Sequence, residues 1–461
     1  MRLLKKQLYL VSLVLFVTLF SSTINVTYAS VKEANALITW KATLQSTNHS
    51  LQTSWVLPPL DNISTSAAPC NWFGVTCNAD GSVNRLNLTD SSLNGTLNNF
   101  TFSSFPNLAY IDLSMNNLFS VISPLIGSLS KLIYLDLSVN QFSGNIPPKI
   151  GLLTNLNTLH LVENQLNGSI PQEIGQLKSL TELALYTNSL SGPIPASLRN
   201  LRNLARLYLY DNDLSGPIPP EIGNLVNLVE LYMDSNNFTG PIPSTLGKLN
   251  KLTELHLSNN HLSELGNLKS LNDLEVSENQ LSGSIHSSLG NLSNLETLFL
   301  RPNQLSGPIP HEFGNLANLI VLEMDENQFS GNLPELCQGG NFFRGWIPQE
   351  LRSLTKLSKL DLSTNKFSGP IPGILENYRN LFYLNLSNNM FNQKIPLQIG
   401  KLFQLTKMDL SSNILIGEIP LEITNLQSLE KLNLSHNKLF GLIPKSFEDM
   451  RGLVYVDILY N

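Results

Sequence analysis

The chain has 461 residues, a formal net charge of −6 at pH 7 and three cysteines. A chain without a basic surplus lacks the electrostatic footprint of a nucleic-acid-binding protein, and its mild acidity indicates little beyond solubility. Three cysteines are few, although two of them lie close together.

The first 29 residues have the features of a secretory signal peptide. The positive residues Arg2, Lys5 and Lys6 precede the apolar run Leu8–Phe20 and small residues at the expected cleavage site. The alternative, a membrane anchor, needs about 20 apolar residues to span a bilayer, and this run is shorter. We therefore predict a signal peptide at residues 1–29, entry into the secretory pathway and no later membrane-spanning segment.

Residues 30–82 differ in composition from the rest of the chain. Apolar residues recur at near-helical spacing just after the signal peptide, and two tryptophans, Trp55 and Trp72, add bulk. Cys70 and Cys77 form a tight pair. Such a pair in a secreted chain favours a disulfide over a zinc site, because no second Cys or His pair lies nearby. We therefore expect a helical cap that is closed by a Cys70–Cys77 disulfide, and no metal.

From residue 83 to residue 461 one pattern recurs: L-x-x-L-x-L-x-x-N-x-L-S-G-x-I-P, with a clean copy at Leu204–Pro219. Its asparagine returns mostly every 24 residues, and Ser91 takes its place in the first copy. This pattern predicts a leucine-rich-repeat solenoid of the α/β class, a curved superhelix of about 16 repeats with parallel strands on its concave face. The asparagines are Asn116, Asn140, Asn164, Asn188, Asn212, Asn236, Asn260, Asn279, Asn303, Asn327, Asn365, Asn389, Asn413, Asn437 and Asn461.

Each position of the pattern has a physical role. Leu207 and Leu209 enter the core, because side chains alternate along a strand, and Tyr208 between them faces outward. Asn212 follows the strand, where a buried turn leaves backbone groups that an amide side chain can satisfy. Gly216 then relaxes the backbone, and the proline after it ends regular pairing.

The cap and the repeats resemble the plant leucine-rich-repeat receptors. The resemblance is carried by Glu33–Leu37, Trp40, the run Pro69–Cys77 and the Ser-Gly-x-Ile-Pro of the repeats, and it covers nearly all of residues 30–461. In that family the repeats form an ectodomain on a membrane helix, usually with a cytoplasmic kinase. The resemblance implies a cell-surface receptor that binds an extracellular peptide or protein, pairs with a leucine-rich-repeat co-receptor kinase and needs no cofactor.

The chain departs from that family's pattern in three places. The interval 260–279 lacks the Gly-x-Ile-Pro part, so we expect the convex side to lose material while the strands continue. The interval 327–365 is too long, and residues 335–347 are expected to protrude beside Cys337, which is either a cysteine without its partner or a buried thiol. The last strand, within 453–458, is expected to be an uncapped edge, and the family's membrane anchor and kinase are absent from the sequence.

No catalytic signature is present, so we expect no enzymatic activity. The sequence contains no G-x-S-x-G motif, no phosphate-binding loop and no kinase motif. Two alternatives to a receptor ectodomain stay open: a secreted inhibitor of cell-wall enzymes of the polygalacturonase-inhibitor type, and a non-functional receptor fragment.

Glycosylation motifs are frequent, as expected of a secreted surface. Asn87, Asn385 and Asn433 occupy the outward position between the last two strand leucines, and Asn167, Asn237 and Asn291 are expected to lie off the strands. The predicted glycosylation sites are Asn48, Asn62, Asn87, Asn94, Asn99, Asn167, Asn237, Asn291, Asn385 and Asn433.

The same outward position indicates where a ligand binds. Near both ends of the repeats it holds Asp or Asn, which we interpret as default polar filler; in the middle it holds aromatic residues, His and Glu. Aromatic residues with a few charges are typical of interfaces, although drift among repeats is an alternative. The predicted ligand-binding residues are His160, Tyr186, Tyr208, Tyr210, Tyr232, Asp234, His256, Glu275, Arg301 and Glu323.

Overall fold

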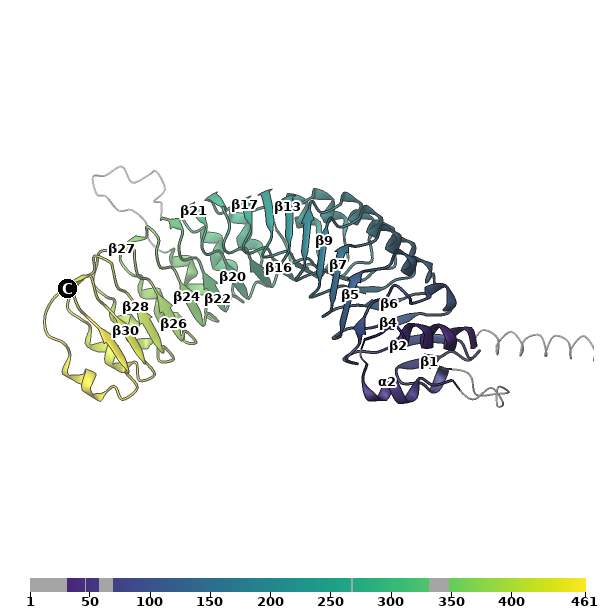
Figure 1. The fold of residues 1–461 in the computed structure, drawn as a ribbon. Helices are drawn as coiled ribbons and strands as arrows, with labels where there is room; N and C mark the ends of the chain where they lie inside the picture. The colour runs from purple at the N-terminus through teal and green to yellow at the C-terminus, as the bar shows by residue number, and fades with distance from the viewer. Residues whose placement is uncertain (1–30, 46, 58–68, 267, 331–347) are drawn as a thin grey trace, which may run out of the picture. The chain divides into compact units, whose positions relative to one another are not determined.

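The computed structural model of the chain describes residues 31–45, 47–57, 69–266, 268–330 and 348–461. They divide into two compact units: unit 1 ends at Asp213, and unit 2 begins at Leu214. Figure 1 shows unit 1 from purple to teal and unit 2 from teal to yellow. The predicted signal peptide, the segment 335–347, Cys337 and Asn62 lie outside the described residues.

The N-terminal cap packs around two tryptophans. It consists of a helix at residues 31–41, the helix α2 (His49–Ser54), the 3-10 helix η2 (Pro69–Asn71) and the strand β1 (Val75–Cys77). Trp40 and Trp55 are buried, and Cys70 and Cys77 are joined by a disulfide. Strand β1 pairs antiparallel with the first strand of the repeats, which ties the cap to the solenoid. None of the helices in the described segments has the length and apolar character needed to cross a bilayer.

Each repeat begins with a short strand that pairs in parallel with the strands of neighbouring repeats. We call these the first-row strands, and the surface formed by their outward side chains the strand face. In unit 1 they are β2 (Val83–Asn87), β4 (Tyr110–Asp112), β6 (Tyr134–Asp136), β8 (Thr158–His160), β10 (Glu182–Ala184) and β12 (Arg206–Tyr208). In unit 2 they are β14 (Glu230–Tyr232), β16 (Glu254–His256), β18 (Asp273–Glu275), β20 (Thr297–Phe299), β22 (Val321–Glu323), β24 (Lys359–Asp361), β26 (Tyr383–Asn385), β28 (Lys407–Asp409), β30 (Lys431–Asn433) and β32 (Tyr455–Asp457).

The segment after each asparagine forms a second row of strands, which the sequence analysis did not predict. Pairing continues through the Leu-Ser-Gly part of the pattern; for example, Ser215 and Gly216 pair with Asn237 and Phe238. The second-row strands are β3 (Asn94–Gly95), β5 (Asn117–Val121), β7 (Gln141–Asn145), β9 (Gln165–Gly168), β11 (Ser189–Gly192), β13 (Asp213–Pro217), β15 (Asn237–Pro241), β17 (His261–Glu264), β19 (Ser282–Ser284), β21 (Gln304–Gly307), β23 (Gln328–Phe329), β25 (Ser368–Gly369), β27 (Met390–Phe391), β29 (Ile416–Gly417) and β31 (Lys438–Leu439).

Where a described repeat has a helical part, that part is a 3-10 turn rather than an α-helix, and it usually follows the proline of the pattern. Neighbouring turns pack so closely that a Cβ added at Gly175 would lie 2.4 Å from the Ser197 carbonyl oxygen. The turns are η3 (Phe102–Ser104), η4 (Pro124–Ser128), η5 (Pro148–Leu152), η6 (Gln172–Gln176), η7 (Ala196–Asn200), η8 (Pro220–Asn224), η9 (Ser244–Lys248), η10 (Ser287–Asn291), η11 (His311–Asn315), η12 (Gln349–Ser353), η13 (Gly373–Asn377), η14 (Leu397–Lys401), η15 (Leu421–Asn425) and η16 (Lys445–Asp449).

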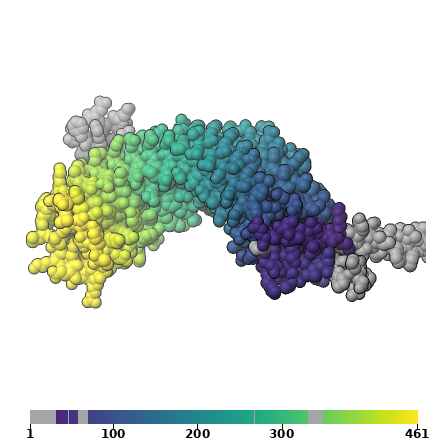
Figure 2. Space-filling model, in the orientation of Figure 1, coloured from purple at the N-terminus to yellow at the C-terminus, as the bar shows by residue number. Residues whose placement is uncertain are grey.

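The recurring asparagines, which we call the asparagine ladder, have the predicted role of satisfying backbone groups of the turns. The Asn188 Nδ2 donates to the carbonyl oxygens of Leu185 and Tyr186 in its own repeat and of Leu161 in the preceding one. Its Oδ1 accepts from the Leu166 N–H at 3.0 Å. Each such asparagine therefore satisfies the backbone of two successive turns, and Figure 2 shows the repeats of each unit packed against their neighbours.

Both irregular repeats keep the first row intact, as predicted. Strand β16 pairs directly with β18 across the short interval, in which the described residues contain no 3-10 turn between β17 and β18. Strand β22 pairs directly with β24 across the long interval. Beside β32, Val454 and Leu459 are 84% and 63% exposed.

Candidate functional site

The last residues of the first-row strands lie side by side in each unit, as the sequence predicted. We call this position the end slot, and the position two residues later the turn slot. In unit 1 the end slots, in register, are Asn87, Asp112, Asp136, His160, Ala184 and Tyr208. In unit 2 they are Tyr232, His256, Glu275, Phe299, Glu323, Asp361, Asn385, Asp409, Asn433 and Asp457.

The Asp and Asn residues in the end slots are not polar filler, and that interpretation is wrong. The Asp409 Oδ1 accepts from the Ser411 N–H at 2.9 Å and from its hydroxyl at 2.6 Å. Asn385 binds Ser387 in the same way. These side chains cap the turn by which the chain leaves the strand, as in other Asx turns. The same end-slot to turn-slot bond is made by Asp112, Asp136, Asp361, Asn433 and Asp457.

Three successive repeats of unit 1 have no such cap. Their end slots hold His160, Ala184 and Tyr208, which have no carboxylate or carboxamide to accept from the turn. A hydrogen bond of this kind contributes about 1 kcal/mol, and these repeats do without it at the end slot. The side chains that replace Asp and Asn therefore do not cap the turn of their own repeat, which favours a role other than turn capping.

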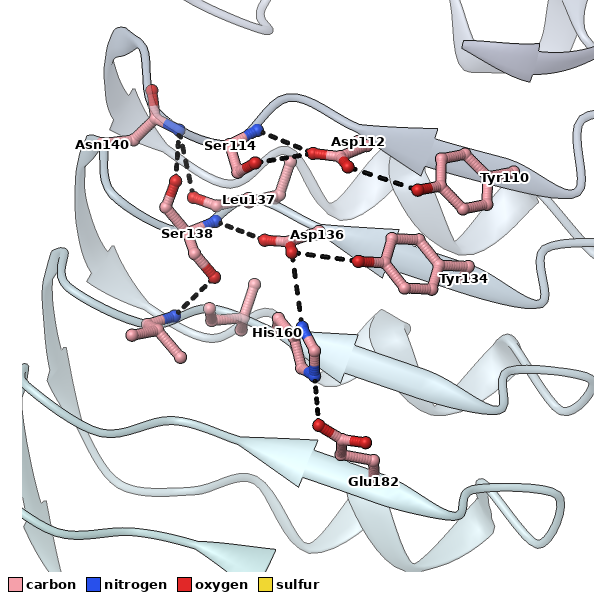
Figure 3. A network of polar contacts seen from close by, with 12 residues as sticks. Tyr110, Asp112, Ser114, Tyr134, Asp136, Leu137, Ser138, Asn140, His160 and Glu182 are labelled. Carbon is pink, nitrogen blue, oxygen red and sulfur yellow. Dashed lines mark hydrogen bonds and ion pairs between the residues drawn. The ribbon is translucent and has the colours of Figure 1, made fainter. Parts of the chain in front are cut away.

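His160 bridges three neighbouring strands of unit 1 (Figure 3). Its Nδ1 lies 3.3 Å from the Asp136 Oδ2 on β6, and its Nε2 lies 2.9 Å from the Glu182 Oε1 on β10. The other Glu182 oxygen accepts from the Arg206 guanidinium on β12 at 3.1 Å. The Tyr134 hydroxyl donates to the same Asp136 oxygen at 3.1 Å. The side chain of His160 is only 21% exposed, so its position is fixed by these partners.

The contacts within this bridge shift the pKa values of His160 and Asp136. Burial alone would lower the pKa of His160, but hydrogen bonds and charges from Asp136 and Glu182 outweigh burial and raise the pKa above 6.5. Burial alone would raise the pKa of Asp136, but hydrogen bonds from His160 and Ser138 outweigh it and lower that pKa. The bridge therefore favours a protonated imidazole between two carboxylates.

A hollow of about 300 Å³ lies on the strand face of unit 1 beside this bridge. On its far side Tyr186 stacks on Tyr210 with ring centroids 4.2 Å apart and meets Tyr208 edge-on at 6.5 Å. The hollow is lined by Ser114, Met115, Asp136, Ser138, Val139, His160, Val162, Glu163, Glu182, Ala184, Tyr186 and Tyr208. The structure therefore brings together His160, Tyr186, Tyr208 and Tyr210 of the predicted ligand-binding residues.

A second group of predicted residues lies on unit 2. The His256 ring stacks on Tyr232 with centroids 4.2 Å apart. Its Nδ1 lies 3.6 Å from the Glu275 Oε2, and its Nε2 lies 3.5 Å from the Asp273 Oδ2, at ion-pair distance but without hydrogen-bond geometry. Burial alone would lower the pKa of His256, but the Asp273 carboxylate and its acidic neighbours raise it. Burial raises the pKa of Glu275.

Of the three remaining predicted residues with charge, Asp234 is an acidic neighbour of His256. The other two, Arg301 and Glu323, form a structural ion cluster. The Glu323 side chain is only 4% exposed and is held by Arg301 on one oxygen and Lys359 on the other. The Arg301 Nη1 also lies 3.5 Å from Asp325, and burial raises the pKa of Asp325 to about 6. The Glu323 side chain therefore faces these two cations and positions them.

Glu182, Glu163 and the apolar residues of the hollow are not among the residues that the sequence predicted to bind a ligand. Glu182 is the first outward residue of its strand, so reading both outward positions of each strand would have found it. Glu163 stands directly before a ladder asparagine in a left-handed conformation (φ 48°), which the repeat pattern does not reveal. Among the described residues, no group of three or more His, Cys, Asp or Glu could hold a metal ion.

The glycosylation motifs fall into two classes in the structure. Asn99, Asn167, Asn237 and Asn291 are exposed, whereas Asn48 caps α2 by accepting from the Leu51 N–H. The Nδ2 atoms of Asn385 and Asn433 donate to the carboxylates of Asp361 and Asp409, each at 3.1 Å. The described motifs Asn87 and Asn94 are half-buried.

Known proteins match this chain in its repeats and its cap. Family models described as leucine-rich repeats match residues 131–153, 155–177, 179–201, 194–398 and 403–461, and the leucine-rich repeat N-terminal domain matches residues 31–78. Two Arabidopsis thaliana proteins are similar over shorter stretches. "MDIS1-interacting receptor like kinase 2" is 48% identical over 22% of this chain, and a "probable leucine-rich repeat receptor-like protein kinase" is 43% identical over 27%. The matched stretches span only 9% and 11% of those relatives.

Solved structures extend the similarity over most of the chain. The crystal structure of a TDR receptor is 32% identical, with a TM-score of 0.74, and the match covers 82% of this chain and 63% of that chain. The plant peptide hormone receptor RGFR1 in complex with RGF2 is 31% identical, with a TM-score of 0.54, and the match covers 77% of this chain and 67% of that one. The chain thus belongs to the leucine-rich-repeat family and is similar to the ectodomains of plant leucine-rich-repeat receptors.

Proposed function

We propose that the chain is the extracellular, ligand-binding part of a plant cell-surface receptor, and that it recognises a peptide on the strand face of unit 1. The proposal rests on one observation, the replacement of turn-capping residues by residues that surround a hollow. Where the frame would place Asp or Asn, the chain places His160, Ala184 and Tyr208 around a hollow. Tyrosines offer rigid contact area at low entropy cost, which suits peptide recognition.

The relatives support the same class of function. RGFR1 is a plant peptide hormone receptor, and it shares the repeat architecture with this chain. By the same resemblance we propose a leucine-rich-repeat co-receptor kinase as partner, a place at the plasma membrane, a signalling or defence role, and no catalysis by the repeats themselves. The Tyr232 and His256 pair of unit 2 is proposed as a second contact region.

A selection experiment tests peptide recognition. The protein, secreted from plant cells, is presented with random displayed decapeptides, and the selected peptides are measured by titration. Tyr186, Tyr208 and Tyr210 changed together to Ala should weaken binding at least about tenfold, because buried aromatic anchors commonly contribute more than 1 kcal/mol each. The control is Asp409→Asn, since Asn fills the same cap in neighbouring repeats.

The selection can contradict the proposal in two ways. Peptides whose affinity is unchanged by the triple substitution, while the thermal stability of the variant equals that of the wild type, would place recognition elsewhere. The absence of any selected peptide would reject peptide recognition itself.

A further inference from the structure

The hollow on unit 1 has an apolar floor and a charged rim. Val162 and Ala184 are buried below it, at 5% and 3% exposure, while Val139 is 39% exposed at its side. The Tyr186 and Tyr208 rings line the hollow together with His160. A volume of about 300 Å³ admits one long side chain rather than a folded partner.

The charges around the hollow are not balanced. Three carboxylates line it, Asp136, Glu163 and Glu182, against one imidazole, His160. Asp136 and Glu182 are both engaged with His160, and Glu182 also with Arg206. Glu163 differs, because among the described residues its exposed carboxylate has no hydrogen-bond or ion-pair partner. The rim therefore offers one uncompensated negative charge above apolar walls.

We propose that this hollow binds a lysine or arginine side chain of the ligand, with Glu163 as the partner of its charged end. The apolar stem would pack on Val139, Val162 and Ala184, as the stems of basic side chains do on apolar surface. The tyrosine ring beside it adds a cation–π contact. This assignment rests on the proposed function, since it names the residue class that a bound peptide presents to unit 1.

Other side chains fit the hollow less well. An acidic side chain would face three carboxylates, and like charges at such distances repel. A purely apolar side chain would fill the floor but gain nothing from Glu163. Charge complementarity, and not only shape, therefore selects a basic occupant.

His160 makes the basic subsite sensitive to pH. Tyr134 and Asp136 face its ring from β6, Glu182 faces it from β10, and Glu163 follows it on its own repeat. When His160 is protonated, the lining carries one more positive charge, which opposes a cationic side chain. When His160 is neutral, the carboxylates that line the hollow attract a cationic side chain without this opposing charge. Binding of a basic side chain therefore tightens as pH rises through the pKa of His160.

The test uses two probes on the secreted protein. The first is a millimolar titration, by ligand-observed NMR, of Nα-acetyl-lysine N-methylamide against Nα-acetyl-norleucine N-methylamide, which keeps the apolar stem without the charge. We expect the lysine probe to bind roughly fivefold more tightly, as for one partly exposed ion pair. The second probe is the set of displayed decapeptides, in which Lys or Arg should be enriched at one position.

Three variants sharpen the test. Glu163→Gln should remove the lysine preference and the enrichment, whereas Glu278→Gln, in the same left-handed position of another repeat, should leave both unchanged. His160→Gln should flatten the pH dependence of lysine binding. Each of these changes is at or near the surface and retains side-chain volume, so the fold should be kept.

The outcomes separate the two proposals. Peptides selected without basic enrichment, together with equal binding of the two small probes, would overturn the basic subsite and leave peptide recognition standing. A lysine preference abolished by Glu163→Gln, without any selected peptide, would support the subsite and reject peptide recognition. Loss of the lysine preference on Glu278→Gln as well would also overturn the assignment of Glu163.

Discussion

Two sets of repeats differ in how the chain leaves the strand. In the repeats of Asp361, Asn385, Asp409 and Asn433, the end-slot side chain accepts from the backbone of the turn. In the repeats of His160, Ala184 and Tyr208 the end-slot side chain has no carboxylate or carboxamide to accept this hydrogen bond. We call the first set the capped repeats and the second set the uncapped repeats.

The comparison shows that the repeat frame and its surface are separable. Both sets keep the buried leucines and the asparagine ladder, and both keep parallel register. The cap is the part of the frame that can be given up, because it faces outward and contributes about 1 kcal/mol. In the uncapped repeats the end slot holds His160, Ala184 or Tyr208 in place of a capping residue.

The largest predicted effect is the loss of local stability when an asparagine of the ladder is removed. This loss should be equal in the capped and the uncapped repeats. Asn413→Ala in a capped repeat and Asn188→Ala in an uncapped one each remove four hydrogen bonds to backbone groups. Each should cost about 2–4 kcal/mol of local stability, because buried backbone groups lose their partners. Amide hydrogen exchange in the flanking strands measures this loss. A much smaller cost in one set would mean that its frame is held in another way.

The next effect concerns the cap itself. Asp409→Ala should lower the exchange protection of the Ser411 amide by roughly five- to tenfold, since one hydrogen bond of about 1 kcal/mol is lost. His160→Ala should leave the Val162 amide protected, because that N–H donates to the Ser138 hydroxyl at 3.2 Å and not to the end slot. Equal loss of protection at both amides would remove the distinction between capped and uncapped repeats.

A third prediction concerns pH and the His160 bridge. The folded-state pKa of His160 is raised, so its contribution to the stability of unit 1 is fully present below about pH 6.5 and is lost as pH rises through the folded value. The pKa of Asp136 is lowered, so its contribution is present above its ordinary pKa and is lost as pH falls through the folded value. Melting temperatures from pH 5 to 8 should decline with pH for the wild type and decline less for His160→Gln. Identical slopes would contradict the bridge.

The smallest effect is on glycan occupancy. Glycans are attached to the Asn Nδ2, and in the capped repeats the Nδ2 atoms of Asn385 and Asn433 donate to neighbouring carboxylates. Asn167, Asn237 and Asn291 are exposed. Glycopeptide mass spectrometry of the secreted protein should therefore find these three more fully occupied than the two in end slots. Full occupancy at Asn385 and Asn433 would show that glycans are added before the caps form.

The sequence by itself determined the repeat frame. Leucine spacing fixed which side chains enter the core, as at Leu207, and the asparagine period fixed the register of the end slots across both irregular intervals. These features repeat in every turn, so a local pattern is enough to state them. The same pattern placed His160, Tyr186, Tyr208 and Tyr210 on one face.

Only the tertiary structure decided what the outward residues do. The cap from Asp409 to Ser411, the burial of Glu323 between Arg301 and Lys359, and the isolation of Glu163 all depend on side-chain distances. Most of these contacts join residues about one repeat apart, which adjacent positions in the sequence do not show. A repeat pattern indicates whether each side chain faces the core or the surface. The partners of that side chain, its charge balance and its place in a hollow follow from packing between repeats.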